Sequence, residues 1–315
     1  MAILKIVEAN QPMVLIAQPH RSGGTLLAQL LDGHPQLHGH PPELNLGPAW
    51  PSLDLTKPAE ELFKAIQEKH LVKAFGDGYH KDGPARKLGL SQQVMSFPLV
   101  LRPKLHAKLF LRLAAQRGLK TQRDVLDCYF TSLYSGWQNY ANVDGVKRWI
   151  VAFRGRYKHD LDRFFADYPD GRTMAIIRDC KAVIASKSRY DGEMHADGLQ
   201  RHVRGWNNQA KSRLVAKASY GDRMFLMTYE RLIGDPEGTM RKVADWLGIA
   251  FDPILLTPTF NHSPIKANSS FEVADVGVQT TARENWRKVF SEQEAAEIDG
   301  ATAELYNEVE RRSDA

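Results

Sequence analysis

The sequence contains little cysteine and no long apolar run. Its two cysteines, Cys128 and Cys180, are too few for a disulfide scaffold, and neither has a metal-like spacing to histidine. No segment approaches the roughly 18 consecutive apolar residues of a membrane helix, and the N-terminal residues lack the apolar stretch of a signal peptide. We therefore expect a cytoplasmic protein in a reducing setting, with no membrane span and no bound metal.

The sequence carries a small excess of positive charge, with basic stretches such as residues 102–117. Lys and Arg total 42 against 37 Asp and Glu, and this net charge of +5 favours an anionic partner without naming it. Basic residues are interleaved with acidic ones and aromatic stacking motifs are absent, which argues against a nucleic-acid or polyanion binder. Repeats and linkers are also absent, so we expect residues 1–315 to form a single domain.

Strands and helices alternate along much of the sequence. Short apolar runs at residues 13–18, 149–153, 173–177 and 223–227 are typical of buried parallel strands. Helical patterns follow the first of these runs, up to Gly33, and cover residues 158–167, 179–189, 236–248 and 292–311. The alternation predicts an α/β fold, with a doubly wound sheet of central parallel strands flanked by helices.

Three other segments do not follow this alternation. Residues 34–51 hold five prolines and three histidines, which predicts an irregular loop that leaves the sheet. Residues 56–146 are mainly helical, and we expect this region to pack beside the sheet and to shape a cleft for the second substrate. Residues 257–282 are polar and contain proline, which favours a loop or a lid.

A glycine-containing loop follows the first predicted strand and leads into a helix. It reads Arg-Ser-Gly-Gly-Thr at residues 21–25. The free N–H groups and the dipole of a helix start attract phosphate, glycines allow close backbone approach, and arginine adds a permanent charge. Taken alone, the loop fits both a phosphate cradle and an ordinary turn. Because no lysine precedes Thr25, it does not match the loop of nucleotide triphosphatases.

A second corner of this kind lies at residues 176–186. Arg178 is predicted at the carboxyl end of a strand, where open α/β sheets bind ligands. Ser186 follows eight residues later, two helical turns on, so its hydroxyl is expected to face the same anion. Taken alone, the segment also fits a helix cap at Asp179 and a surface ion pair at Arg178.

Together, the two corners resemble the sulfotransferase family that uses 3′-phosphoadenosine-5′-phosphosulfate (PAPS). The family's 5′-phosphosulfate loop reads like [RK]SGTT, and its 3′-phosphate motif reads like RDPRAVxxS. Three further segments are similar to the family's YEDL, SSF and GDWK elements. The matching residues, in order along the chain, are 21–25, 178–186, 228–232, 268–271 and 284–287.

The resemblance implies a P-loop-type α/β fold, and transfer of the sulfuryl group of PAPS to an acceptor hydroxyl by in-line displacement, with PAP as product. It also assigns the nucleotide contacts. The residues implied for the 5′-phosphosulfate are Arg21, Ser22, Gly23, Gly24 and Thr25. Those implied for the 3′-phosphate are Arg178 and Ser186, and those near the adenine and ribose are Tyr229, Ser269 and Phe271.

Two positions depart from the family pattern. Gly24 replaces the first threonine of the loop and so removes one hydroxyl contact. Gln-Thr-Thr at residues 279–281 stands where many members have a basic triplet. This leaves a third 3′-phosphate contact open, with Arg283 or Arg287 as the substitute.

The sequence offers two candidates for the catalytic base, Glu43 and His40. Where cytosolic members have a catalytic Lys and His, the family spacing leads to Arg154 and Arg156, and Arg154 supplies charge but no base. In similar branches the base comes from the loop after the first helix. Glu43, which follows a rigid Pro-Pro pair, is the first choice and His40 the second. The alternatives are a capping or ion-pairing role for Glu43 and a solvent-facing His40. Arg21 is expected to balance the charge of the leaving phosphate.

The acceptor and the oligomeric state are left open by the sequence. A hydroxyl-bearing small molecule, a glycan or a lipid would each serve as acceptor. Two other functions compete with sulfuryl transfer. A P-loop kinase that uses ATP would need a lysine in the loop and an aspartate for Mg²⁺. The hypothesis of a non-enzymatic polyanion or nucleic-acid binder is supported only by the net positive charge.

Overall fold

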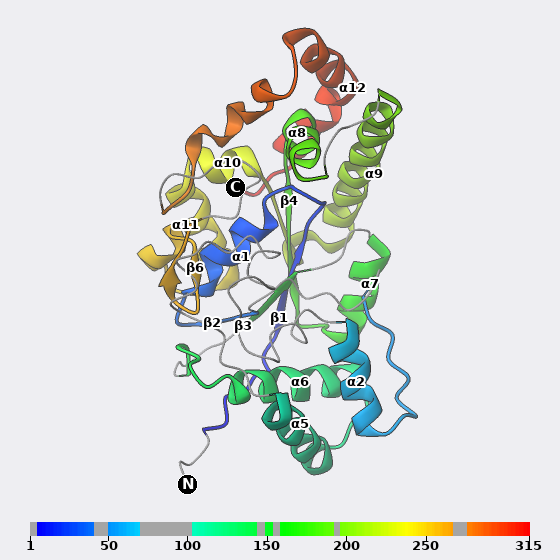
Figure 1. Ribbon diagram of the computed structural model, residues 1–315, viewed down its shortest axis with the longest axis vertical. Coiled ribbons are helices and arrows are strands. Elements are labelled where there is room, and N and C mark those ends of the chain that lie inside the picture. The colour runs from blue at the N-terminus through cyan, green and yellow to red at the C-terminus, as the bar shows by residue number, and fades with distance from the viewer. Residues whose placement is uncertain are drawn as a thin grey trace.

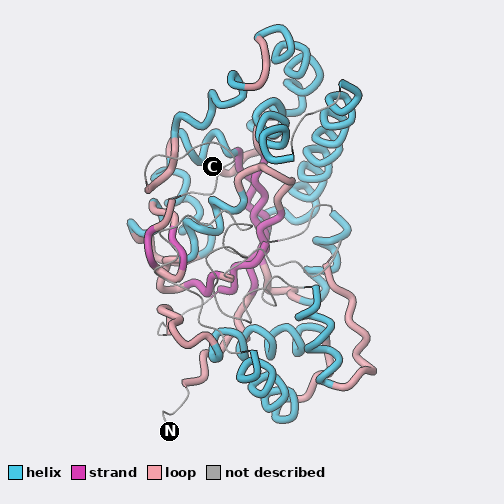
Figure 2. The backbone as a smooth tube through the Cα atoms, viewed as in Figure 1, coloured by secondary structure: helices cyan, strands magenta, loops and turns pink. Residues whose placement is uncertain are grey.

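A computed structural model describes residues 5–40, 50–69, 103–143, 149–153, 158–191, 196–266 and 276–315. These residues form a five-stranded parallel sheet in the order β2-β3-β1-β4-β5, which Figures 1 and 2 show at the centre of the molecule. The strands are β1 Met13–Ala17, β2 Leu37–Gly39, β3 Trp149–Phe153, β4 Arg172–Ile177 and β5 Met224–Thr228. The predicted α/β class, with central parallel strands flanked by helices, is confirmed.

The central strand β1 is buried along its whole length. It pairs with β3 on one side and with β4 on the other, so that Val14 lies opposite both Val151 and Arg172. All five of its residues are 0% exposed. An apolar run without alternation is what such a strand requires, because helices cover both of its faces.

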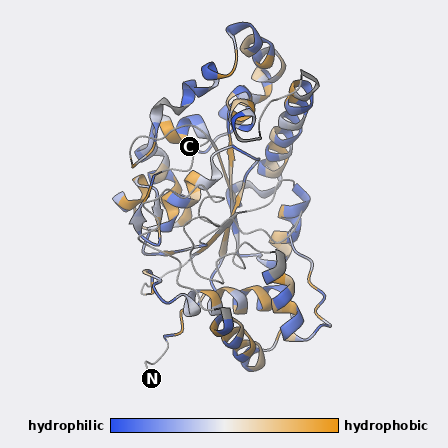
Figure 3. Ribbon diagram, viewed as in Figure 1, coloured by the Kyte–Doolittle hydropathy of each residue, from blue (hydrophilic) through white to orange (hydrophobic). Residues whose placement is uncertain are grey.

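The two faces of the sheet are covered by different sets of helices (Figure 1). One face packs against α1 Gly24–Asp32, α10 Tyr229–Gly234 and α11 Pro236–Leu247. The other packs against α7 Lys158–Asp167, α8 Cys180–Asp191, α9 Ala196–Tyr220 and α12 Glu292–Arg311. In Figure 3 these helices carry both hydrophilic and hydrophobic residues, as expected where only one stripe of a helix meets the core.

Neighbouring strands β1 and β4 send their helices to opposite faces of the sheet. The helix α1, which follows β1, contributes Leu27 and Leu30 to one core, whereas α8, which follows β4, contributes Val183 and Ile184 to the other. The two connections therefore diverge at the carboxyl ends of adjacent strands. Such a switch point is where open α/β sheets bind ligands.

Capping residues set the ends of several helices where the sequence predicts them. Asp235 accepts a hydrogen bond from the N–H of Gly238 (2.9 Å) at the start of α11. The same helix ends at Gly248, whose φ of 67° is left-handed and favours glycine. A reciprocal pair between Ser291 and Glu294 begins α12. These caps explain why the predicted ranges of both helices agree with the structure.

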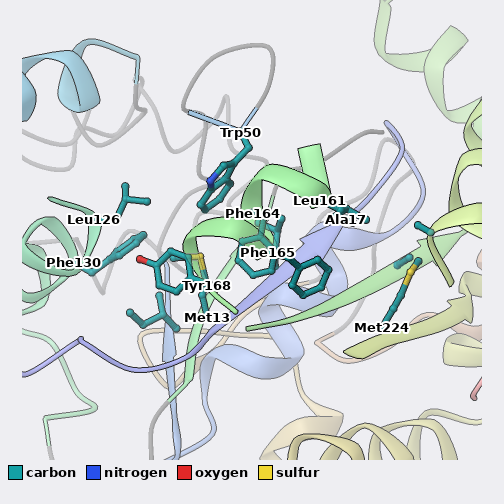
Figure 4. Packing of buried hydrophobic residues seen from close by; sticks show 14 of the residues in the cluster. Met13, Ala17, Trp50, Leu126, Phe130, Leu161, Phe164, Phe165, Tyr168 and Met224 are labelled. Carbon is teal, nitrogen blue, oxygen red and sulfur yellow. The ribbon is translucent and has the colours of Figure 1, made fainter. Parts of the chain in front are cut away.

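The helices α2 Ala59–Lys69, α5 Pro103–Arg117 and α6 Gln122–Gly136 lie at the amino-terminal end of the strands. Ser135 and Thr131 of α6 accept hydrogen bonds from the N–H groups of Val7 (2.9 Å) and Ala9 (3.1 Å), ahead of β1. Figure 4 shows Phe130 of α6 in the same apolar cluster as Met13. The helical content of residues 56–146 is therefore confirmed where it is described. A role in an acceptor cleft stays a prediction.

Other segments differ from the sequence prediction or add to it. Residues 34–51 do not form an entirely irregular loop, because β2 lies within them and pairs with β3. The 25-residue helix α9 was not predicted. Residues 257–282 include a short hairpin, β6 Thr259–Phe260 and β7 Ser263–Pro264. The described residues also include the 3₁₀ helices η2 Gly221–Arg223, η3 Pro253–Leu256 and η4 Thr280–Lys288. Within the described ranges, no helix is both long and apolar enough to cross a membrane.

Candidate nucleotide site

The loop after β1 has the backbone of an anion-binding corner. Arg21 and Gly23 both have left-handed φ angles, of 65° and 103°. The buried Ser22 hydroxyl donates to the carbonyl of Pro19 (2.8 Å) and holds the turn closed. The helix α1 begins directly afterwards, and in the described part of the chain no side chain caps its start. Its first N–H groups and the helix dipole therefore favour an anion here.

Both glycines of this loop have close neighbours. A Cβ on Gly23 would overlap the ring of Tyr229, and a Cβ on Gly24 would overlap the side-chain amide of Gln18. Gln18 therefore fills the space where a threonine side chain at position 24 would lie. This contact gives a physical reason for the departure from the family pattern at Gly24.

The second corner lies at the end of β4. Arg178 is 8% exposed, and its guanidinium carbon lies 4.4 Å from the centre of the Tyr229 ring. The carbonyl of Arg178 accepts a hydrogen bond from the indole N–H of Trp206 (2.8 Å). Asp179 caps the following helix by accepting from the N–H of Ala182 (3.1 Å). The capping role predicted for Asp179 is therefore observed together with a buried, oriented Arg178.

The two corners meet at side-chain level. Arg21 Nε donates to Ser186 Oγ at 2.9 Å, although 165 residues separate them in the sequence. Tyr229, from the start of α10, contacts both Gly23 and Arg178. Burial raises the pKa of Tyr229, and the positive charge of Arg178 opposes this rise. Two permanent cations, a glycine turn and an aromatic ring thus gather at the switch point of the sheet.

The other predicted residues are not gathered there to the same extent. His40 is 6% exposed, and its ring meets Phe130 of α6 edge-on at 5.8 Å. It follows Gly39, which lies at the level of Val14 in β1 rather than at the end of that strand. His40 is thus buried rather than solvent-facing. Glu43, Arg154, Ser269 and Phe271 lie outside the described residues. The catalytic role of His40 stays a prediction.

The two arginines considered for a third phosphate contact differ in their surroundings. Arg287 Nε pairs with Glu284 (2.6 Å), its Nη1 pairs with Glu292, and the guanidinium lies over Trp286 at 4.4 Å. Arg283 reaches toward Gly234, at the end of α10. Gly234 is at the opposite end of α10 from Tyr229, and a third phosphate contact by Arg283 or Arg287 stays a prediction.

Three residues of this corner were not predicted from the sequence. Gln18 packs against the glycine loop. Trp206 donates a hydrogen bond to the Arg178 carbonyl, and Glu230 accepts one from the Asp179 N–H. Glu230 directly follows Tyr229 in the matched YEDL-like segment, so its position was visible in the sequence. Trp206 lies in α9 and carries no such signal.

The fold and these two corners define an α/β protein with a candidate anion site at the switch point of its sheet. Comparison with known proteins then identifies the family. The model of the sulfotransferase family matches residues 12–253, and the chain belongs to this family. Among proteins with curated descriptions, none matches the sequence.

Two solved structures share the fold at low sequence identity. The sulfotransferase domain from the Synechococcus PCC 7002 olefin synthase has a TM-score of 0.52 and 20% identity, covering 93% of this chain and 94% of that one. The sulfotransferase domain from the curacin biosynthetic pathway has a TM-score of 0.51 and 18% identity, covering 93% and 98%. Both show the fold of the chain.

Proposed function

We propose that this protein transfers the sulfuryl group of PAPS to a hydroxyl of an acceptor and releases PAP. The observation that carries the proposal is the hydrogen bond between Arg21 and Ser186 (2.9 Å), which joins the two predicted anion sites. A single nucleotide with phosphates at both ends is the ligand that would occupy both. The acceptor is a hydroxyl-bearing small molecule, a glycan or a lipid.

The described residues fit such a nucleotide. Glycines at 23 and 24 let a phosphate approach the start of α1. Arg178 is held against the Tyr229 ring with its guanidinium carbon 4.4 Å from the ring centre, so its orientation is fixed before a ligand arrives. We assign Arg21, Ser22, Gly23, Gly24 and Thr25 to the 5′-phosphosulfate, and Arg178 and Ser186 to the 3′-phosphate.

The proposed reaction is an in-line displacement at sulfur. The acceptor oxygen forms a bond to sulfur while the bond from sulfur to the phosphate oxygen breaks. Glu43 takes the proton of the acceptor hydroxyl, and Arg21 balances the negative charge that grows on the leaving phosphate. Arginine suits this task because it stays charged at any working pH.

Binding measurements test the nucleotide assignment. We expect PAP to raise the melting temperature of the protein, and ATP with Mg²⁺ to have no comparable effect. Arg178→Ala should weaken PAP binding by about 2 kcal/mol, roughly 30-fold, through the loss of a charge-assisted hydrogen bond. Arg241→Ala is the matched control, because that arginine pairs with Glu237 on the surface of α11. Equal PAP affinity in both variants would reject the 3′-phosphate assignment, and stabilisation by ATP with Mg²⁺ alone would favour a kinase.

Turnover measurements test the base. Glu43→Gln should abolish transfer of sulfuryl from labelled PAPS while PAP binding is retained, because the substitution removes the proton acceptor without removing a nucleotide contact. His40→Asn is the comparison for the second candidate. If Glu43→Gln turns over at the wild-type rate and His40→Asn does not, the base is His40.

A further inference from the structure

The C-terminal helix α12 reaches the second corner of the candidate site. Tyr306 of α12 donates its hydroxyl hydrogen to Glu230 Oε2 at 2.7 Å. About two turns earlier in the same helix, Asp299 accepts from Lys181 Nζ at 2.7 Å. Lys181 also binds Asp179 (2.8 Å), the residue after Arg178. A helix far along the chain is thus bonded to the segment that presents Arg178.

Glu230 is a buried carboxylate with defined partners. It is 9% exposed, and its Oε1 accepts the N–H of Asp179 at 3.2 Å. Burial raises the pKa of Glu230, whereas the hydroxyl of Tyr306 and the charge of Arg178 oppose the rise. The carboxylate therefore interacts with Arg178 electrostatically and with the following peptide N–H directly.

Tyr306 connects two of the groups that hold Arg178. Its hydroxyl binds Glu230, and its ring centre lies 6.4 Å from that of Trp206. Trp206 in turn donates to the carbonyl of Arg178 (2.8 Å). The guanidinium rests on Tyr229, the neighbour of Glu230 in α10. The backbone of Arg178 is thus bonded to Trp206, whose ring lies beside that of Tyr306, and its guanidinium rests on the residue next to Glu230.

We propose that Tyr306 is a positioning residue for Arg178. Tyr306 acts through Glu230 and thereby influences the affinity of Arg178 for the 3′-phosphate of the nucleotide. The proposal rests on the proposed function, because it takes Arg178 as the 3′-phosphate contact. A carboxylate that is fixed by the tyrosine hydroxyl holds the backbone N–H of Asp179, the residue after Arg178, and its negative charge attracts the guanidinium. Binding then does not have to order a long flexible side chain.

The experiment compares two nucleotides that differ only in the 3′-phosphate. Tyr306→Phe should weaken binding of PAP by about 3- to 10-fold, the effect of one lost hydrogen bond. Binding of adenosine 5′-monophosphate should be unchanged, because it does not use Arg178. In a double-mutant cycle, Tyr306→Phe should have no further effect on PAP in the Arg178→Ala background.

A matched control separates positioning from general destabilisation. Tyr168→Phe removes a similar hydrogen bond, from a buried tyrosine to Asp127 (3.0 Å), at the amino-terminal end of β4. It should leave the preference for PAP over adenosine 5′-monophosphate unchanged. If Tyr306→Phe keeps the wild-type preference for PAP over adenosine 5′-monophosphate, whether or not both affinities fall, the positioning role is overturned. If the wild-type protein shows no preference for PAP, the proposed function fails instead.

Discussion

At the scale of single residues, Gly23 has two separate reasons to be glycine. Its φ of 103° is left-handed, and a Cβ would overlap the Tyr229 ring. Gly23→Ala should therefore weaken PAP binding at least as much as Arg178→Ala does, because the added Cβ intrudes on the phosphate loop and the displaced ring can no longer support Arg178. Backbone strain adds a loss of about 1–2 kcal/mol in the free energy of unfolding. Titration with PAP and denaturant unfolding measure the two effects.

Gly118 provides a control that isolates the backbone term. Its φ of 76° is also left-handed, but nothing lies within 4 Å of the Cβ that an alanine would carry. Gly118→Ala should show a similar loss of stability and normal PAP binding. If both variants bind PAP normally, the contact between Gly23 and Tyr229 does not support the nucleotide site.

Motif residues of the site could be predicted, whereas their supporting contacts could not. Arg21 and Ser186 each lie in a recognisable βα corner, and their order along the chain suggested one ligand. The hydrogen bond between them spans 165 residues, and only the sheet order brings it about. Gln18 and Trp206 belong to no motif, since ordinary polar and aromatic residues acquire such roles through packing alone.

At the scale of elements, prediction succeeded where local signals are strong. The caps Asp235 and Ser291 determine where α11 and α12 begin. The strand β2 was missed because it has three residues within a segment rich in proline and histidine. The helix α9 was missed because its buried stripe includes small and charged residues such as Ala210 and Arg213 rather than a clear apolar pattern.

The edge strand β5 is covered by the segment that follows α12. The N–H of Leu226 donates to Asp314 Oδ2 (2.7 Å), and the carbonyl of Leu226 accepts from the N–H of Asp314 (2.8 Å). Asp314→Ala should lower the free energy of unfolding by about 1–3 kcal/mol, because it leaves the backbone N–H of a buried strand residue without its acceptor. Denaturant unfolding measures this loss.

The contact of Asp314 with Lys217 (2.8 Å) should matter less than its contact with the strand. Both side chains of this ion pair are partly exposed, and such pairs contribute little. Asp314→Asn, which keeps an oxygen acceptor, should therefore retain most of the stability that Asp314→Ala loses. Asp222→Ala, at an exposed site two residues before β5, is the control. Equal losses in the Asn and Ala variants would assign the effect to the ion pair.

At the scale of the whole molecule, α6 joins the amino-terminal helices to the base of the sheet. Its Arg123 pairs with Asp170 (2.6 Å) in the turn before β4, and its Asp127 accepts from the hydroxyl of Tyr168 (3.0 Å). Trp50 donates its indole N–H to Asp167 (2.7 Å) at the same junction. The candidate site lies at the opposite end of β4. Stability at this junction and nucleotide binding should therefore be separable by mutation.

The carboxyl group of Asp127 makes this junction sensitive to pH. Burial raises the pKa of Asp127 to about 6; Tyr168 and Arg123 oppose the rise, and Asp124 adds to it. The folded protein thus binds more protons at this site than the unfolded chain between the ordinary pKa of 3.8 and about 6. Its contribution to stability is fully present below the first value and is lost as the pH rises through the second.

Asp127→Asn should reduce the fall in stability between pH 4 and pH 6. The asparagine oxygen still accepts from Tyr168 but carries no proton that leaves with rising pH. Denaturant unfolding midpoints of the variant and the wild type are measured across this pH range. The difference between the two proteins cancels the contributions of all other titrating groups. Asp170→Asn, at the half-exposed partner of Arg123, is the control for the ion pair. If stability falls by the same amount in Asp127→Asn as in the wild type, the role of Asp127 is contradicted. A smaller fall in stability with unchanged PAP affinity would show that the two ends of β4 act independently.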